Sequence, residues 1–136
     1  MFLLDTNVVS ELRRPERTDA KVAAWADRAV SIDLFLSSIT VLELETGVLM
    51  LARRDASAAK VIRRWIDDRV FPAFSDRILP VDTDVARRCA ALNVPDPRPY
   101  RDSLIAATAL VHHLTLVTRN SADFEPMRVT LFNPWQ

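Results

Sequence analysis

The sequence predicts an α/β fold in which helices cover a short, mostly parallel central sheet. At 136 residues the chain has the length of one domain, residues 1–136, and is long enough to bury a core. Short apolar runs alternate with longer amphipathic segments, which is the pattern of strands joined by helices. Hydrophobic residues make up 49% of the chain and charged residues 26%, as in an ordinary globular domain.

The first quarter of the chain contains two predicted strands and two predicted helices. Residues 2–4 (FLL) form an apolar run that predicts a strand, and residues 8–13 (VVSELR) predict a short helix. Residues 34–38 (LFLSS) also predict a strand. Residues 19–30, which lie between them, predict a helix because an apolar stripe runs along Val22, Ala23, Trp25, Ala26 and Ala29.

The middle of the chain predicts two long helices, a strand and a third helix. Residues 40–54 have a helical pattern, and a second helix over residues 58–71 follows a short charged break. Residues 77–81 (RILPV) predict a strand. Residues 83–92 predict a helix, because the Asp-Thr pair at its start supplies a capping side chain.

The last part of the chain begins with its clearest loop, residues 95–99 (PDPRP), which hold three prolines in five residues. A helix over residues 100–113 leads into a buried strand over residues 114–118 (LTLVT), and residues 128–132 (RVTLF) are the last predicted strand. Ligands of open parallel sheets bind outside the carboxyl ends of the strands. This rule directs attention to Asp5, which follows the first strand.

Composition excludes several classes of protein. No apolar run approaches the roughly 18 residues of a transmembrane helix, and the N-terminus lacks the pattern of a signal peptide. We therefore expect a cytoplasmic protein that does not bind a membrane. The single cysteine, Cys89, excludes an internal disulfide and a cysteine-built zinc site. A net charge of zero argues against coating of nucleic acid by bulk electrostatics but permits a local basic surface.

Asp5 is followed by Thr6 and Asn7, and this pattern allows two interpretations. The carboxylate caps the helix that begins after the strand, or it is a metal ligand. One carboxylate is a poor magnesium site, so the second interpretation requires companions at other strand ends or on facing helices.

The segment VLELETG offers the first companion. Glu43 lies on the same helix face as Gly47, the only glycine of the chain. A glycine inside a helix costs about 1 kcal/mol relative to alanine, so we expect it to permit a close backbone approach. Glu45 points about 200° away around the helix and is expected to face solvent. Taken alone, both glutamates are equally well explained as solvated surface residues.

Asp102 begins an otherwise apolar helix whose following face is small, with Ala106, Ala107 and Ala109. Small side chains predict tight packing beneath the carboxylate. An aspartate in the first turn of a helix normally interacts with the backbone amides and the helix dipole. Capping is therefore the simpler explanation of this residue when it is considered alone.

The segment TRNSADFEP follows the strand LTLVT and brings Thr118, Asn120 and Asp123 to the end of a parallel strand. Turn chemistry alone also selects asparagine, serine and aspartate at such positions. A turn and a polar site are therefore equally good interpretations of this segment.

Two further aspartates and the histidines are left out of the predicted site. Asp82 and Asp84 repeat the pattern of the opening segment, but helix capping accounts for them fully. His112 and His113 are adjacent, so a helix cannot direct both at one ion, and we expect them at the surface or at a helix end.

Three blocks of the sequence, LLDTNVVSEL, SSITVLELETG and RDSLIAATALVHHLTLVTRNSADFEP, together resemble the PIN-domain ribonucleases. The resemblance is to the VapC-type toxins of bacterial toxin–antitoxin pairs, including their FitB-like branch, and it covers essentially the whole chain. It implies a PIN-like α/β/α sandwich formed by residues 1–136. It also implies an Mg²⁺-dependent endoribonuclease that acts as the toxin of a type II pair.

The same resemblance implies the residues of the active site. By matching positions, the acidic metal-site residues are Asp5, Glu43, Asp102 and Asp123. Polar residues around them are Thr6, Asn7, Thr118 and Asn120. Oxygen ligands select Mg²⁺, or Mn²⁺, over zinc, and four carboxylates in one pocket require a compensating cation. We expect Asp5 and Asp102 to be primary ligands, Glu43 to hold or deprotonate a water, and Asp123 to bind a second ion or orient its water.

The resemblance also implies partners. A cognate VapB-like antitoxin that binds DNA is expected to cover the acidic site, insert a basic side chain into it and form a hetero-oligomer with the toxin. RNA is the expected substrate. The family also implies a homodimer. The tryptophans of the chain are compatible with a dimer interface, but core packing explains them equally well; they are Trp25, Trp65 and Trp135. One departure is the approach PDPRPYRD, in which Arg101 precedes Asp102; this arginine either pairs with phosphate or faces away.

Three other classes of protein fit the sequence less well. A phosphatase with an aspartate nucleophile requires a second aspartate two residues after the first, where this chain has Asn7. A phosphoacceptor receiver domain requires a lysine late in the chain, and no lysine follows Lys60. A PIN fold kept only for binding is not indicated, because all four acidic positions are filled.

Overall fold

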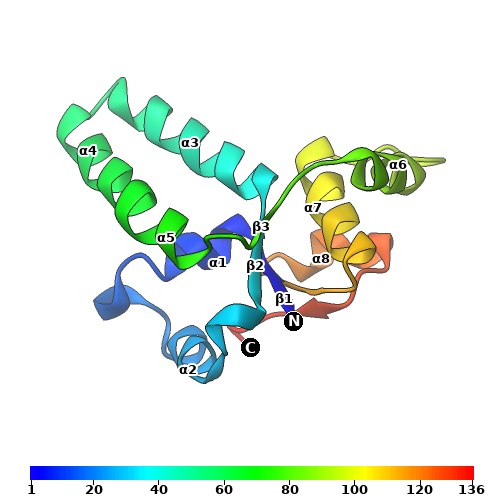
Figure 1. Cartoon of the computed structure of the whole chain (residues 1–136), viewed down its shortest axis with the longest axis horizontal. Coiled ribbons are helices and arrows are strands. Elements are labelled where there is room, and N and C mark those ends of the chain that lie inside the picture. Colours follow the sequence, from blue (N-terminus) through cyan, green and yellow to red (C-terminus); the bar gives the residue numbers. More distant parts are fainter.

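The computed structural model describes all 136 residues and confirms the predicted α/β fold (Figure 1). Five short strands form one sheet in the order β3-β2-β1-β4-β5, and every neighbouring pair is parallel. The strands are β1 (Phe2–Leu4), β2 (Leu34–Ser37), β3 (Ile78–Leu79), β4 (Thr115–Val117) and β5 (Leu131–Phe132). No helix of the chain is long and apolar enough to cross a membrane.

Helices connect and cover these strands. The α-helices are α1 (Thr6–Glu11), α2 (Ala20–Arg28), α3 (Ser38–Ala52), α4 (Ala56–Trp65), α5 (Phe71–Ala73), α6 (Thr83–Leu92), α7 (Tyr100–Val111) and α8 (Ser121–Phe124). Short 3-10 segments are η1 (Pro15–Arg17), η2 (Ser31–Asp33) and η4 (Glu125–Met127), and η3 (Ile66–Val70) is a π-helical turn.

Most predicted boundaries shift by one or two residues, and the shifts have local causes. The helix α4 begins before residue 58, because the Asp55 carboxylate accepts a hydrogen bond from the Ala58 amide at 3.0 Å and caps the first turn. The last predicted strand shortens to two residues, because Arg128 is left-handed with φ 56° and ends the preceding 3-10 turn.

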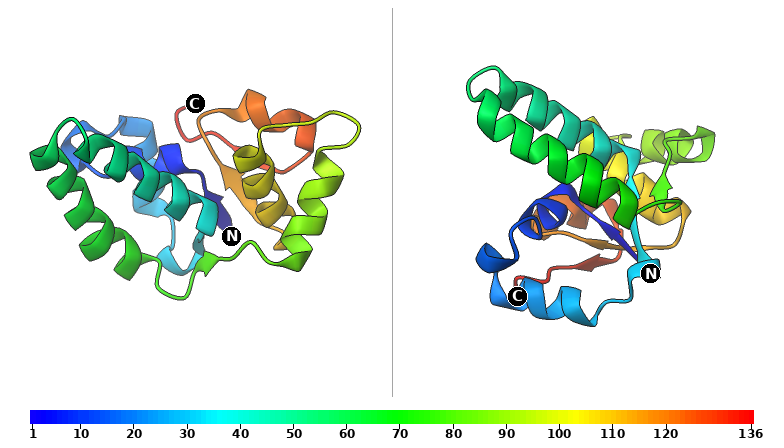
Figure 2. Two further views of the ribbon diagram at one scale, coloured as in Figure 1. Left: turned by 90° about the horizontal axis from the view of Figure 1, so that it is seen from above. Right: turned by 60° about the vertical axis from the view of Figure 1, so that its left-hand side comes forward.

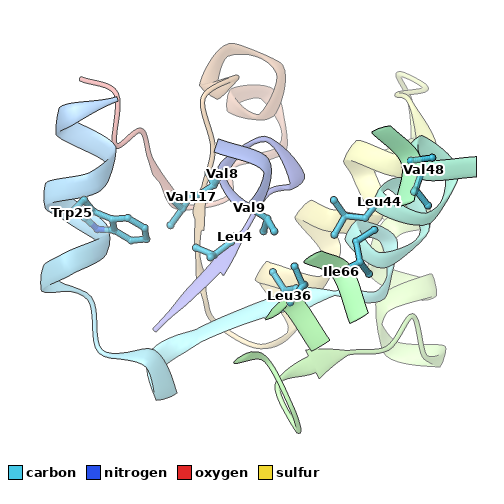
Figure 3. Packing of buried hydrophobic residues seen from close by; sticks show 11 residues of the cluster. Leu4, Val8, Val9, Trp25, Leu36, Leu44, Val48, Ile66 and Val117 are labelled. Carbon is cyan, nitrogen blue, oxygen red and sulfur yellow. The ribbon is translucent and has the colours of Figure 1, made fainter. Parts of the chain in front are cut away.

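The two faces of the sheet bury separate hydrophobic clusters. Along β1, Leu3 faces one cluster and Leu4 the other, and Leu116 and Val117 alternate in the same way along β4. The Leu4 side packs against α1, α2 and the α3–α4 hairpin (Figure 3). The Leu3 side packs against α7 and α8. Figure 2 shows these two groups of helices on either side of the strands, as in the expected sandwich.

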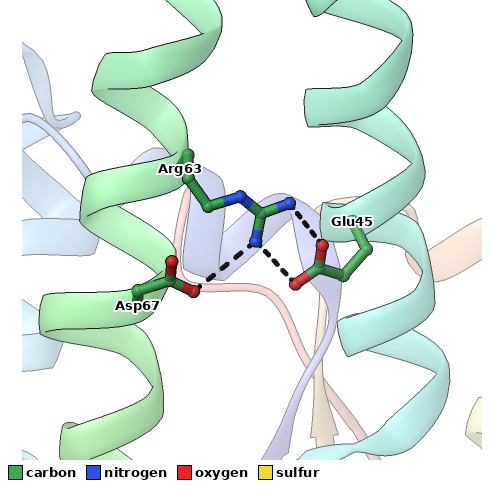
Figure 4. A network of polar contacts seen from close by, with 3 residues as sticks. All are labelled: Glu45, Arg63 and Asp67. Atoms are coloured by element: carbon green, nitrogen blue, oxygen red, sulfur yellow. Dashed lines mark hydrogen bonds and ion pairs between the residues drawn. The ribbon is translucent and has the colours of Figure 1, made fainter.

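The α3–α4 hairpin is held by an ion pair that corrects one prediction. Glu45 does not simply face solvent, because both of its carboxylate oxygens accept from the Arg63 guanidinium on α4, at 2.9 and 2.5 Å (Figure 4). Arg63 also lies 3.5 Å from Asp67. Figure 4 shows the arginine between the two carboxylates, where it joins neighbouring helices.

The expectation for Gly47 is also wrong. A Cβ atom added there would meet nothing within 4 Å, and the residue is exposed. The close contact between α3 and α4 is made instead by the adjacent face that carries Leu44 and Val48. The glycine is therefore not required for backbone packing against α4.

The Leu4 side of the sheet provides a test of the core. Leu36 is fully buried in that cluster, so Leu36→Ala is expected to lower the free energy of unfolding by about 2–5 kcal/mol. Leu49→Ala, at a side chain that is 64% exposed on α3, is expected to change it by less than about 0.5 kcal/mol. Chemical denaturation measures both, and equal effects would contradict the assigned core.

Candidate active site

Asp5 lies where β1 ends and α1 begins, and it caps that helix, as the first interpretation of the opening segment predicts. Its Oδ1 accepts from the Thr6 amide at 2.8 Å, as a helix cap. Its Oδ2 accepts from the Thr118 hydroxyl at 2.8 Å and from the Asn7 amide group at 3.3 Å. The residue is only 7% exposed, and this burial raises the pKa of its carboxyl.

Thr118 links the ends of β1 and β4. These strands are adjacent and parallel, so their carboxyl ends lie at the same edge of the sheet, and the Asp5 amide donates to the Val117 carbonyl at 2.9 Å. The Thr118 hydroxyl donates to Asp5 and accepts from the Asn120 amide at 3.1 Å and from Asn7 at 3.4 Å. The buried hydroxyl therefore fixes the orientation of the Asp5 carboxylate.

Glu43 reaches the same edge from α3. Its Oε1 accepts from the Thr6 hydroxyl at 2.8 Å, and that hydroxyl also lies 3.2 Å from the hydroxyl of Thr40. Thr40 is fully buried and was missed by the sequence analysis. Its position three residues before Glu43 places both on one helix face, which is the sequence feature that could have identified it.

Asp102 lies in the first turn of α7 but does not cap it. Pro99 is the N-cap, and no side chain accepts a capping hydrogen bond there. The pKa of the Asp102 carboxyl is raised by burial first, then by the charges of Asp123 and Glu43. The simpler explanation of this residue as a cap is therefore not supported, and the carboxylate lies among others of the same charge.

Asp123 and Asn120 lie at the outer side of the site. Asp123 is exposed on α8, and Asn120 is exposed just before that helix. Asn120 contributes its backbone amide, not its side chain, to the hydrogen bonds around Thr118. Asn7 completes this network, because its Oδ1 accepts from the Arg119 amide at 3.3 Å.

The four carboxylates thus come from four parts of the chain, and the pKa values of two of them, Asp5 and Asp102, are raised. The charges of Glu43 and Asp102 add to the burial effect on the pKa of Asp5. No group of three histidine, cysteine, aspartate or glutamate side chains is placed to hold a metal ion. The arrangement is a region of negative charge with carboxylate oxygens, which are the class of ligand that Mg²⁺ prefers in proteins.

The residues set aside in the sequence analysis have the expected roles. Asp82 caps α6 by accepting from the Val85 amide at 3.0 Å, and Asp84 is an exposed residue in the first turn. His112 is the C-cap of α7, and His113 has a φ of 56°, so both mark a helix end.

A partly buried polar network holds the start of α7. Asn93 donates to the Cys89 carbonyl at 2.8 Å and to the Ser103 hydroxyl at 3.1 Å, and its Oδ1 accepts from the Arg98 amide at 2.8 Å. These bonds join the end of α6, the proline loop and the residue that follows Asp102. These bonds hold the backbone next to Asp102 and so position its carboxylate.

A groove of about 680 Å³ lies away from the carboxylates, between α1 and the α4–α5 segment. It is lined mainly by apolar side chains, together with Arg13, Arg64, Asp68 and Arg69. None of the four predicted acidic residues lines it. The groove is therefore a second surface feature, separate from the candidate active site.

Comparisons with known proteins match the chain along nearly its whole length. The family model described as the PIN domain matches residues 2–127. The toxin FitB of Neisseria gonorrhoeae is 39% identical over 140 residues, which cover 99% of each chain. The VapC ribonuclease Y4jK of Sinorhizobium fredii is 37% identical over 142 residues, which cover 100% of this chain and 99% of the relative.

A solved structure has the same fold. The structure of FitAB bound to a DNA fragment contains a chain that superposes with a TM-score of 0.88 at 37% identity. The match covers 100% of this chain and 96% of the other. The likeness extends to the whole arrangement of strands and helices.

Asp102 offers a test of the repulsion between the carboxylates of the site. In the folded protein its pKa is raised above the ordinary 3.8, so the ionised carboxylate destabilises the fold above that pH, and stability rises as the pH falls through the raised pKa. Asp102→Asn is therefore expected to raise the melting temperature at pH 7 in chelator. The gain is expected to shrink as the pH approaches 3.8.

The matched control is Asp82→Asn, which keeps a helix cap because asparagine caps as well as aspartate. Its melting temperature is expected to follow that of the wild type at every pH. A loss of stability in Asp102→Asn at pH 7 would contradict the assigned repulsion.

Proposed function

The chain belongs to the PIN-domain family, and from this premise we propose that it is a metal-dependent endoribonuclease that acts as the toxin of a toxin–antitoxin pair. The observation that carries the proposal is the convergence of Asp5, Glu43 and Asp102 from three separate elements, with the pKa values of both aspartates raised. Burying like charges together is costly unless a cation compensates them. The names of the relatives, a toxin and a ribonuclease, support the same activity.

In chemical type the donor set suits Mg²⁺ or Mn²⁺, since it consists of carboxylates with hydroxyl and amide groups around them, although no three of the carboxylates are spaced to hold an ion together in this structure. When bound, such an ion lowers the pKa of a coordinated water and offsets the charge that develops on a phosphodiester. Asp5 and Asp102 would hold the ion. Asp123, which lies at the outer side, would hold a second ion or orient a water.

The remaining polar residues set the orientation of these carboxylates. Thr118 holds one oxygen of Asp5 through a buried hydrogen bond, which leaves the carboxylate no freedom to turn away. Thr6 donates to Oε1 of Glu43, so the other oxygen of that glutamate is directed to accept a proton from the attacking water. Asn7 and Asn120 both donate hydrogen bonds to the Thr118 hydroxyl, and so help to hold the group that orients Asp5.

The substrate we propose is single-stranded or loop RNA, whose bases and backbone are more accessible to such a site than those of a duplex. Attack by water on the phosphorus, with departure of the 3′ oxygen, gives one 5′-phosphate end and one 3′-hydroxyl end. The cytoplasmic location and the homodimer expected from the sequence stay predictions.

We propose that the partner is a cognate antitoxin, because the relative FitB is named as a toxin and a toxin–antitoxin complex from Klebsiella pneumoniae contains a chain of the same fold at 25% identity and a TM-score of 0.71. A basic side chain of the antitoxin would compensate the carboxylates in place of the metal. The apolar groove between α1 and α4 is the surface for an amphipathic segment of the same partner. Its three arginines against one aspartate favour acidic residues along that segment.

Cleavage of RNA tests the activity. We expect cleavage of single-stranded RNA with Mg²⁺ or Mn²⁺ and none with chelator. Asp5→Asn and Asp102→Asn are each expected to reduce the rate by at least about 100-fold, and Asp84→Asn, an exposed residue outside the site, is expected to keep it. End analysis of the products is expected to show 5′-phosphates.

Metal binding gives a second readout for the same variants. Mg²⁺ is expected to raise the melting temperature of the wild type and of Asp84→Asn, but not that of Asp5→Asn or Asp102→Asn. Cleavage of equal rate by Asp5→Asn and the wild type would contradict the proposed site.

Co-purification tests the partner. The product of a small open reading frame beside the gene is expected to co-purify with the chain. Val61→Glu, at a residue that lines the groove and is 59% exposed, is expected to weaken this association. Leu49→Glu, at a 64% exposed residue outside the groove, is expected to leave it intact. Equal binding by both variants would reject the groove as the docking surface.

A further inference from the structure

Arg101 is the cation that lies closest to the acidic site. It occupies the first turn of α7, directly before Asp102, and its side chain is 57% exposed. Its Nη1 lies 4.0 Å from Oε2 of Glu43, on the facing helix α3. The guanidinium therefore reaches from α7 toward α3 on the side of the carboxylates, and does not face away from them.

This contact is loose, and no other ion pair of the chain involves a carboxylate of the site. Its length is at the outer limit of an ion pair, and the other oxygen of Glu43 is already held by Thr6. Arg119, the other arginine near the site, lies with its guanidinium 5.2 Å over the ring of Trp135. Arg101 is thus the one guanidinium that is both near the carboxylates and weakly held.

A phosphodiester that approaches four carboxylates meets repulsion. A guanidinium at the edge of the site reduces this repulsion, and its planar fork matches two phosphate oxygens. The amide groups at the start of α7 add a favourable field for an anion at the same place. An exposed arginine with one weak partner can exchange that partner for phosphate at little cost.

We propose that Arg101 binds a phosphate of the RNA beside the scissile bond and releases Glu43 when it does so. The inference rests on the proposed ribonuclease function and adds a residue that positions the substrate. Because the phosphate replaces Glu43 as its partner, the glutamate becomes free to accept the proton of the attacking water. Arg101 therefore acts on the binding of RNA, and the carboxylates act on the chemical step.

The experiment measures steady-state cleavage of a single-stranded RNA oligonucleotide that the wild type cuts, in Mg²⁺ and at several salt concentrations. Arg101→Gln is expected to raise KM by about 10- to 100-fold and to change kcat by less than about threefold. The slope of log KM against log salt is expected to fall by about 0.7, the share of one phosphate contact on a single strand. Arg101→Lys keeps the charge without the planar fork, so its KM is expected to lie between those of the wild type and Arg101→Gln.

The matched control is Arg28→Gln, which removes the same charge from an exposed residue at the end of α2. That helix leads to the start of β2, at the edge of the sheet opposite to Asp5. The control is expected to keep the KM and the salt dependence of the wild type. Melting temperatures of all variants show whether any change in rate comes from loss of the fold.

The outcomes separate this inference from the function on which it rests. If the wild type cleaves no RNA, the proposed function is rejected. If the wild type cleaves and Arg101→Gln matches Arg28→Gln in KM and salt slope, only the role of Arg101 is rejected. A loss in kcat with unchanged KM also rejects it, because the arginine would then act by holding Glu43 and not by binding phosphate.

Discussion

The parallel pairing of β1 with β4 is the constraint on which the rest of the molecule depends. It places two residues that are 113 positions apart, Asp5 and Thr118, within 2.8 Å of each other. After β1 the chain adds β2 and β3 on one side of that strand, and then crosses to add β4 and β5 on the other side. The carboxyl ends of β1 and β4 therefore lie side by side at the point where the strand order reverses. The α3 and α7 carboxylates gather around that point.

The site and the fold have opposite requirements. Burial and like charge raise the pKa values of Asp5 and Asp102, so each ionised carboxylate reduces the stability of the protein without a cation. The two clusters on the faces of the sheet supply the stability that makes this possible. The hydrogen bonds of Asn93 and Thr118 then hold the repelling groups in place. The proposed cation, the Arg101 guanidinium and a basic side chain of the proposed partner would each reduce the same excess of negative charge.

The sequence predicted the fold well because each strand is an apolar run between polar breaks, and a parallel sheet follows from strands that alternate with helices. It grouped the four carboxylates into one predicted site only through family resemblance, since capping, solvation or turn chemistry explained each of them alone at least as well. It could not predict contacts between distant residues. The ion pair of Glu45 with Arg63 and the open space at Gly47 depend on which face of α3 meets α4, and that rotation is set by packing of the whole core.

The central position of the first strand has a consequence for synthesis of the protein. β1 leaves the ribosome first, yet one of its two neighbours, β4, begins only at Thr115. Until that strand emerges, Asp5 lacks Thr118, and the helix that carries Asp102 has no completed sheet to cover. A growing chain therefore lacks the assembled acidic site until β4 and Thr118 have emerged. The cleavage of RNA that we propose for this protein, its own message included, therefore cannot begin before the fourth strand has been made.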